Sequence, residues 1–260
     1  MGKVFVITNR KGGCGKSFTT ASLGVGLARQ GNKVLCIDTD NQHSLTVSMG
    51  VREPDKLPVS LTTIISDIIA ERDYDPTAGI IHHEEGVDLL PANNSLTGIE
   101  LALASLIGRE TILRQHIEKV RHLYDYCIFD TCPTLDMLAV NALAAADSAI
   151  IPVTPKYLDA KGLELLLKSI AQIRKHINPN LSICGILMTM VDKRTNFTKE
   201  IIAMIEQAYG ENIRIFKDHI PHSVRAAETS ATGKSIFTHD PNGKVAAAYA
   251  ALTGEVLNCG

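Results

Sequence analysis

The most constraining stretch of the chain is a glycine-rich loop that follows a short apolar segment near the N-terminus. Residues 4–7 are apolar with strand character, residues 9–17 read Asn-Arg-Lys-Gly-Gly-Cys-Gly-Lys-Ser, and a helical pattern follows. Glycines allow a tight turn whose backbone N–H groups point inward, and the helix N-terminus adds the positive end of a dipole. We therefore predict a loop that binds a polyphosphate.

The side chains of this loop fit nucleotide chemistry. Lys16 is expected to bind the β- and γ-phosphates, and Ser17 to offer its hydroxyl to Mg²⁺. The strict phosphate-loop motif requires glycine at position 10, where the chain has arginine, and a dinucleotide fingerprint would require glycine at position 18. The predicted nucleotide-binding residues are Gly12, Gly13, Cys14, Gly15, Lys16, Ser17 and Phe18.

A second lysine, Lys11, starts the loop, and this form of it resembles the deviant Walker A family of ParA, MinD and nitrogenase iron-protein ATPases. In that family the extra lysine reaches the phosphates of the partner in a nucleotide-sandwich dimer. The resemblance implies that Lys11 and Lys16 are catalytic, that ATP and Mg²⁺ are the cofactors, and that the protein forms a homodimer with ATP.

The rest of the chain alternates apolar strand-like runs with helical patterns. Strands that are apolar throughout and separated by helices indicate an α/β fold with a mostly parallel sheet covered on both faces. With 260 residues and 45% hydrophobic content, we expect one P-loop domain over residues 1–260. The expected strands are 3–8, 33–38, 87–91, 125–130, 148–153, 183–190 and 213–216, and the expected helices are 16–30, 61–71, 95–107, 109–122, 135–146, 158–177, 197–209, 222–230 and 242–257.

Carboxylates follow two of the expected strands, at the edge of a parallel sheet where ligands gather. Asp130 ends an apolar strand, as expected of a Walker B aspartate that holds Mg²⁺. The segment from Asp38 to Gln42 is similar to the Asp-x-Asp-Pro-Gln motif of the family, which implies a Mg²⁺ role for Asp38 and an attacking water positioned by Asp40. Residues 131–133 are similar to the family's switch loop.

Two later segments, residues 185–196 and 220–228, match the ParA branch of the family closely. We expect the adenine to lie near Met190, Asp192 and Pro221, because a flat base needs apolar faces and a polar edge. Members of this branch bind DNA without sequence preference, and the arginines carried over by position are Arg194 and Arg225.

The amino-acid composition is compatible with DNA binding but does not by itself indicate it. The net charge of −2 gives no global attraction to nucleic acid, so a local patch must supply it. The apolar runs are far shorter than the ~20 residues that span a bilayer, and we expect a cytoplasmic protein. Residues 82–85 are expected to form a solvated turn, and the six cysteines to be mostly buried, reduced thiols.

The resemblance thus implies a weak ATPase for plasmid or chromosome partition, nucleoid-associated and stimulated by a ParB-type partner. The alternative is a MinD-like or other nucleotide-switch ATPase that positions a protein partner without DNA. A membrane foot is not expected, because residues 245–257 contain no lysine or arginine. An iron-protein-type reductase would need a second cysteine suitably placed beside Cys132, and a nucleotide-gated module would not need Asp40 and Asp130 for turnover.

Overall fold

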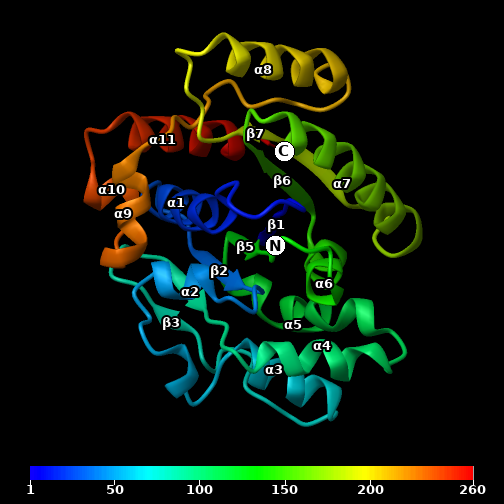
Figure 1. Cartoon of the computed structure of the whole chain (residues 1–260). Helices are drawn as coiled ribbons and strands as arrows, with labels where there is room; N and C mark the ends of the chain where they lie inside the picture. The colour runs from blue at the N-terminus through cyan, green and yellow to red at the C-terminus, as the bar shows by residue number, and fades with distance from the viewer. Residues whose placement is uncertain (260) are drawn as a thin grey trace.

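A seven-stranded sheet forms the centre of the computed structural model, which describes residues 1–259 (Figure 1). The strand order is β3-β4-β2-β5-β1-β6-β7, and all neighbours run parallel except β3 and β4. The first strand lies between β5 and β6, so the loop after it emerges at the middle of the sheet's carboxyl edge. The strands are β1 (Lys3–Ile7), β2 (Val34–Asp38), β3 (Ile81–His82), β4 (Asp88–Leu90), β5 (Tyr126–Asp130), β6 (Ser148–Val153) and β7 (Ser182–Met188).

Two hydrophobic cores lie on opposite faces of the sheet because side chains alternate along each strand. Val4 and Val6 face one core, whereas Phe5 and Ile7 face the other. The first core is covered by α3 (Leu61–Ile69), α4 (Leu96–Ala104), α5 (Ile112–Val120), α6 (Met137–Ala145), α7 (Tyr157–His176) and α8 (Asn196–Tyr209). The second is covered by α1 (Lys16–Ala28), α2 (Ser44–Ser48), α9 (Val224–Thr232), α10 (Ile236–His239) and α11 (Lys244–Leu257). The predicted fold class, a mostly parallel sheet with helices on both faces, is confirmed.

Several features of the fold differ from the sequence expectation. The strand expected at 213–216 is only an isolated parallel bridge between Ile186 and Ile215. The elements β3, α2 and α10 were not expected, because they are too short for a periodic pattern. Cys184 and Cys259 form a disulfide, so the expectation of reduced thiols was wrong for these two. Gly260, the last residue of the expected domain, lies outside the described residues.

The turn between β3 and β4 is a tertiary contact, and its reading as a purely solvated turn was wrong. The carboxylate of Glu85 accepts hydrogen bonds from Ser235 N, at 2.7 Å, and from Ser235 Oγ. His83 Nε2 lies 3.1 Å from the carbonyl oxygen of Gly233. This turn therefore holds the connection between α9 and α10 against the body of the molecule. None of the helices within residues 1–259 combines the length and apolar character needed to cross a bilayer.

His116, on α5, is a buried imidazole whose two ring nitrogens have no hydrogen-bond partner among residues 1–259. Burial and, secondarily, Lys119 lower its pKa to about 4. Because the unfolded chain binds the proton near pH 6.5, the folded state loses stability as the pH falls from about 6.5 to about 4. As the pH falls from 7 to 5, we expect His116 to lower the free energy of unfolding by about 2 kcal/mol.

The measurement is urea unfolding of the parent and of His116→Phe at both pH values. The variant keeps a ring in the core but cannot be protonated, so its stability should fall by about 2 kcal/mol less than that of the parent. Equal losses in the two proteins would remove His116 as the source of the acid sensitivity.

Candidate nucleotide-binding site

The loop between β1 and α1 has the backbone that its glycines allow. Gly13 and Gly15 have φ angles of +72° and +86°, in the left-handed region that other residues rarely adopt. A Cβ added to Gly13 would meet no atom within 4 Å, so the requirement for glycine there is conformational and not steric. Gly15 lies directly before the first residue of α1 and turns the chain into the helix. The loop therefore surrounds the N-terminus of α1, as phosphate binding requires.

Lys16 points back over this loop. Its side chain is largely buried, and Nζ donates a hydrogen bond of 3.1 Å to the carbonyl oxygen of Lys11. Asn9 fixes the start of the loop, because Nδ2 donates to the carbonyl oxygen of Pro152 at 2.6 Å and Oδ1 accepts from Lys11 N at 3.1 Å. Sequence reasoning gave Asn9 no role. Its signal was its place between the apolar strand and the first lysine of the loop.

Lys11 differs from Lys16 in the direction of its stem. Its Cγ and Cε lie 3.7 and 3.8 Å from the position that a Cβ on Gly162 of α7 would take. The stem therefore lies along α7, on the outer side of the loop. The next residue, Gly12, is exposed, and a Cβ added to it would meet only the ring carbons of Pro133, at 3.9 and 4.0 Å.

Asp38 and Asp130 lie opposite each other on neighbouring strands, and both are fully buried. Asp38 accepts hydrogen bonds from Asp40 N at 3.0 Å and from Thr46 N and Oγ1 at 2.8 and 2.7 Å. Burial raises the pKa of Asp38 to about 6 despite these bonds. Its carboxylate thus already orients the loop after β2, and its predicted role as a Mg²⁺ ligand stays a prediction.

Asp130 has an oxygen that the described residues leave without a partner. Thr20 Oγ1 donates to Oδ1 at 3.2 Å, and the Ser17 side chain acts to lower the pKa of this carboxyl group, whereas Oδ2 is buried and unbonded. Burial, and next the charge of Asp38, raise the pKa of Asp130 well above its usual value. An unbonded buried carboxylate oxygen beside a serine hydroxyl suits a hard cation such as Mg²⁺, so these residues fit the expected metal.

Asp40 lies on the loop that follows β2, close to this pair. It is 5% exposed, and its Oδ1 accepts a hydrogen bond from Gln42 N at 2.9 Å. Thr39, the residue before it, donates through N and Oγ1 to the carbonyl oxygen of Asp130, at 3.0 and 2.6 Å. The structure thus gathers Asp38, Asp40 and Asp130 beside the N-terminal part of α1.

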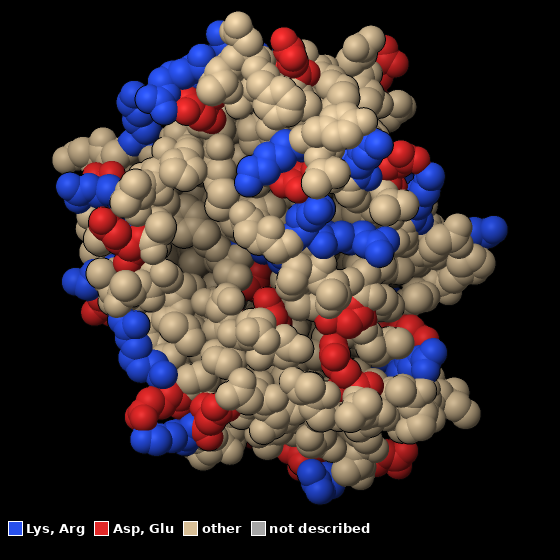
Figure 2. Space-filling view, in the orientation of Figure 1, with Lys and Arg blue, Asp and Glu red and all other residues tan. Residues whose placement is uncertain are grey.

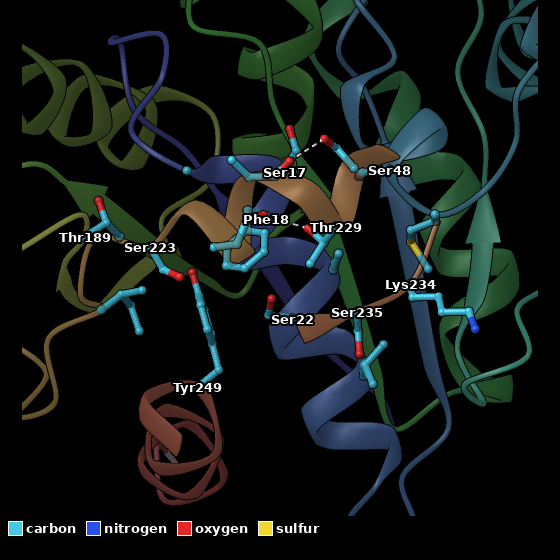
Figure 3. Close-up of a pocket in the computed structure, with 18 of the residues that line it drawn as sticks. Ser17, Phe18, Ser22, Ser48, Thr189, Ser223, Thr229, Lys234, Ser235 and Tyr249 are labelled. Carbon is cyan, nitrogen blue, oxygen red and sulfur yellow. Dashed lines mark hydrogen bonds between the residues drawn. The ribbon is translucent and has the colours of Figure 1, made fainter. Parts of the chain in front are cut away.

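A cavity of about 310 Å³ continues from the loop, between α1 and the segments around α9. Gly15, Ser17, Phe18, Met190 and Pro221 line it, so these five predicted residues are brought together. Figure 3 shows the Phe18 ring in the middle of the cavity, with Thr189, Ser223 and Tyr249 on one side and Thr229 and Ser235 on the other. Its apolar wall with a few hydroxyls is the environment expected for a base.

Asp192 does not join this group. Its carboxylate binds Arg194, and these bonds, as the largest cause, lower its pKa to about 2. Met190 does line the cavity, and its φ of +52° is a left-handed conformation that is rare for a residue with a side chain. The two arginines predicted to bind DNA, Arg194 and Arg225, are both exposed.

Several known proteins are similar to this chain in sequence. The sequence model of the AAA domain family matches residues 2–183. The chain is 38% identical over 258 residues to the sporulation initiation inhibitor protein Soj of Bacillus subtilis, covering 98% of both chains. It is 35% identical over 257 residues to the chromosome-partitioning ATPase Soj of Thermus thermophilus, covering 96% of this chain and 94% of the relative.

Two solved structures have the same fold. A cobyrinic acid a,c-diamide synthase from Mycobacterium smegmatis, with bound ADP and magnesium, superposes with a TM-score of 0.85 at 32% identity, over 99% of this chain and 95% of that one. A putative plasmid partition protein of Borrelia burgdorferi B31 bound to AMPPNP superposes with a TM-score of 0.80 at 25% identity, over 99% of each chain.

The ligands of these structures match the cofactors expected from the sequence, ATP and Mg²⁺. The resemblance read from Lys11, Asp40 and Asp130 is likewise confirmed at the level of the family. With its full-length similarity to two Soj proteins and its parallel sheet around a deviant phosphate loop, the chain belongs to the Soj/ParA family of P-loop partition ATPases.

Proposed function

We propose that this protein is an ATP-dependent DNA partition ATPase that acts as a nucleotide-sandwich homodimer. The dimer binds DNA without sequence preference, and hydrolysis, stimulated by a ParB-type partner, releases it. The observation that carries the proposal is that the side chains of the two lysines point in different directions. Lys16 arches over its own loop, while the stem of Lys11 lies outside it along α7, available to a second molecule.

The chemistry assigned to the site is phosphoryl transfer to water. Such a reaction needs an in-line nucleophile and neutralised phosphate charge more than covalent help from the protein. Lys16 and the amides of Gly13 to Ser17 bind the phosphates, and Asp40, buried beside them, orients the water. Bound Mg²⁺ supplies further charge neutralisation, and Ser17 and Asp130 would hold it.

The site of a single subunit lacks the Lys11 that a partner subunit would contribute. This accounts for the proposed weak intrinsic activity. The protein would act in the cytoplasm, on the nucleoid. Partition is favoured over the diamide synthesis named for the M. smegmatis protein because the Soj relatives are the more similar in sequence. A nucleotide switch that positions a protein partner without DNA is the second candidate, and DNA retention separates the two.

Asp130→Asn tests the metal site. The amide keeps the size of the side chain but removes its charge. The gain in ATP affinity that Mg²⁺ produces should therefore be smaller than in the parent by a factor of about 10 or more. The measurement is calorimetric titration of ATP with Mg²⁺ and with EDTA. Asp218→Asn, at an exposed position on the far side of β7, is the control. Parental Mg²⁺ dependence in Asp130→Asn would remove Asp130 from the metal site.

Gly12→Val tests the sandwich dimer. Gly12 is exposed and does not adopt the left-handed conformation, and a Cβ added to it would make only ordinary van der Waals contact with Pro133, so valine should fit within one subunit. A partner backbone approaching this surface would meet the new side chain. We expect near-parental nucleotide affinity but no dimer, measured by light scattering after gel filtration with a slowly hydrolysed ATP analogue.

The matched control is Gly254→Val, because Gly254 is likewise exposed with no atom within 4 Å of an added Cβ. This control should dimerise as the parent does. Dimerisation of Gly12→Val with the analogue would contradict the sandwich arrangement.

Double replacement of Arg194 and Arg225 by alanine tests the DNA surface. Each arginine that contacts a phosphate contributes about one unit to the salt slope of binding, so the double variant should lose affinity and about two units of slope per subunit. The assay is co-sedimentation with DNA in ADP, ATP and a slowly hydrolysed analogue. Replacement of Arg174 and Lys175, two exposed cations at the end of α7, is the control. Unchanged retention in the test variant would move the DNA surface elsewhere.

A further inference from the structure

The two arginines of the proposed DNA surface have different surroundings. Arg194 Nε donates to Asp192 Oδ1 at 2.8 Å, and Arg194 Nη2 donates to Asp192 Oδ2 at 2.7 Å. The backbone N of Arg194 also donates to Asp192 Oδ1, at 3.1 Å. Arg225, by contrast, forms no ion pair with any of residues 1–259.

The bond between Asp192 and Arg194 uses the same donors that a phosphate needs. A guanidinium binds a carboxylate or a phosphate through two parallel N–H groups, and the two anions compete for that fork. The side chain of Arg194 is 89% exposed, so its position on the surface leaves it open to a large polyanion while its fork is already occupied. The pair also cancels the charge of the arginine at short range.

Neighbouring charged groups favour the ionised form of the Asp192 carboxylate. The hydrogen bonds from Arg194 are the largest cause that lowers the pKa of Asp192 to about 2, and His222 acts in the same direction. Figure 2 shows Lys and Arg side chains gathered at the upper left, where Figure 1 places the loop that leads into α8, with an acidic side chain against them. Asp192 itself is paired with one cation of this loop, Arg194.

We propose that Asp192 sets the DNA affinity of this protein by holding the guanidinium of Arg194 as an intramolecular substitute for a DNA phosphate. The proposal rests on the proposed function, since it assigns Asp192 a role in the same surface. A DNA phosphate must displace the carboxylate before it can bind Arg194 at two points. Exposed ion pairs are weak, so the displacement costs a few-fold in affinity and does not block binding.

The pair is also close to the nucleotide cavity along the chain. Met190, which lines the cavity, is two residues before Asp192. Between them, Val191 N donates to the carbonyl oxygen of Ile220 at 2.9 Å, and His222 N donates to the carbonyl oxygen of Val191 at 3.2 Å. These bonds join the loop of Arg194 to the segment that leads to Arg225. A base bound in the cavity would therefore lie against the segment that carries Asp192 and Arg194.

The test compares parent, Asp192→Asn and Asp192→Asn/Arg194→Ala by fluorescence anisotropy with a labelled 24-base-pair duplex at saturating slowly hydrolysed ATP analogue. Asparagine has one carbonyl oxygen and no charge, so it frees the fork. We expect Asp192→Asn to bind the duplex about 3- to 10-fold more tightly, because no carboxylate has to be displaced before Arg194 binds a phosphate. The double variant should lose this gain.

The matched control is Glu200→Gln, which removes one exposed negative charge from α8 without freeing Arg194. It should change the affinity less than 2-fold. An equal gain in Glu200→Gln and Asp192→Asn would show a general charge effect, and an unchanged affinity in Asp192→Asn would show that Arg194 is not held back; either result overturns the proposal. If the parent and all variants fail to bind the duplex, the proposed function itself fails, and this inference with it.

Discussion

Two buried carboxylates side by side, Asp38 and Asp130, form the constraint on which the nucleotide site depends. Carboxylates without a counter-charge are costly inside a protein, and their proximity raises the pKa of Asp130 further. Two neighbouring helices donate to them: Thr20 of α1 donates to Asp130, and Thr46 of α2 donates to Asp38. The helix that follows the phosphate loop is thus joined to the sheet through the same acids that suit a divalent cation. Folding and cofactor binding make use of one arrangement.

This arrangement extends to the surface through the loop that follows β5. Thr131 Oγ1 donates to the carbonyl oxygen of Ile7 at 2.9 Å, which joins the loop to the end of β1. Two residues later, Pro133 is the nearest neighbour that a side chain on Gly12 would meet. The loop that carries Asp130 therefore runs from the buried acids to the exposed backbone beside Lys11. A change in the cation site has a short path of packed atoms to the surface where a second copy is proposed to dock.

The sequence predicted what depends on local order and missed what depends on distant contacts. The loop, its lysines and the strand-end acids could be located because each follows directly from a strand, and parallel strands bring their carboxyl ends to one edge. Glu85 could not be assigned, because its partner Ser235 is 150 residues away and nothing in either segment indicates the other. Asp192 was assigned to the cavity on the strength of its place after β7. In the structure its carboxylate is bonded to the guanidinium of Arg194, two residues away, and does not line the cavity.

The near-neutral net charge of the chain is compatible with the proposed DNA surface, because electrostatic attraction in salt has a short range. Exposed charges act over roughly 8 Å at physiological salt, so a phosphate responds to the few cations beside it and not to the net charge of −2. A small number of arginines is then sufficient if a dimer doubles them on one face. The same short range makes each of them sensitive to one neighbouring acid. In the proposed partition cycle the protein binds DNA and then leaves it. Such a cycle gains from this sensitivity, since a surface that binds weakly can be switched by a single subunit contact, whereas a strongly basic one would stay bound.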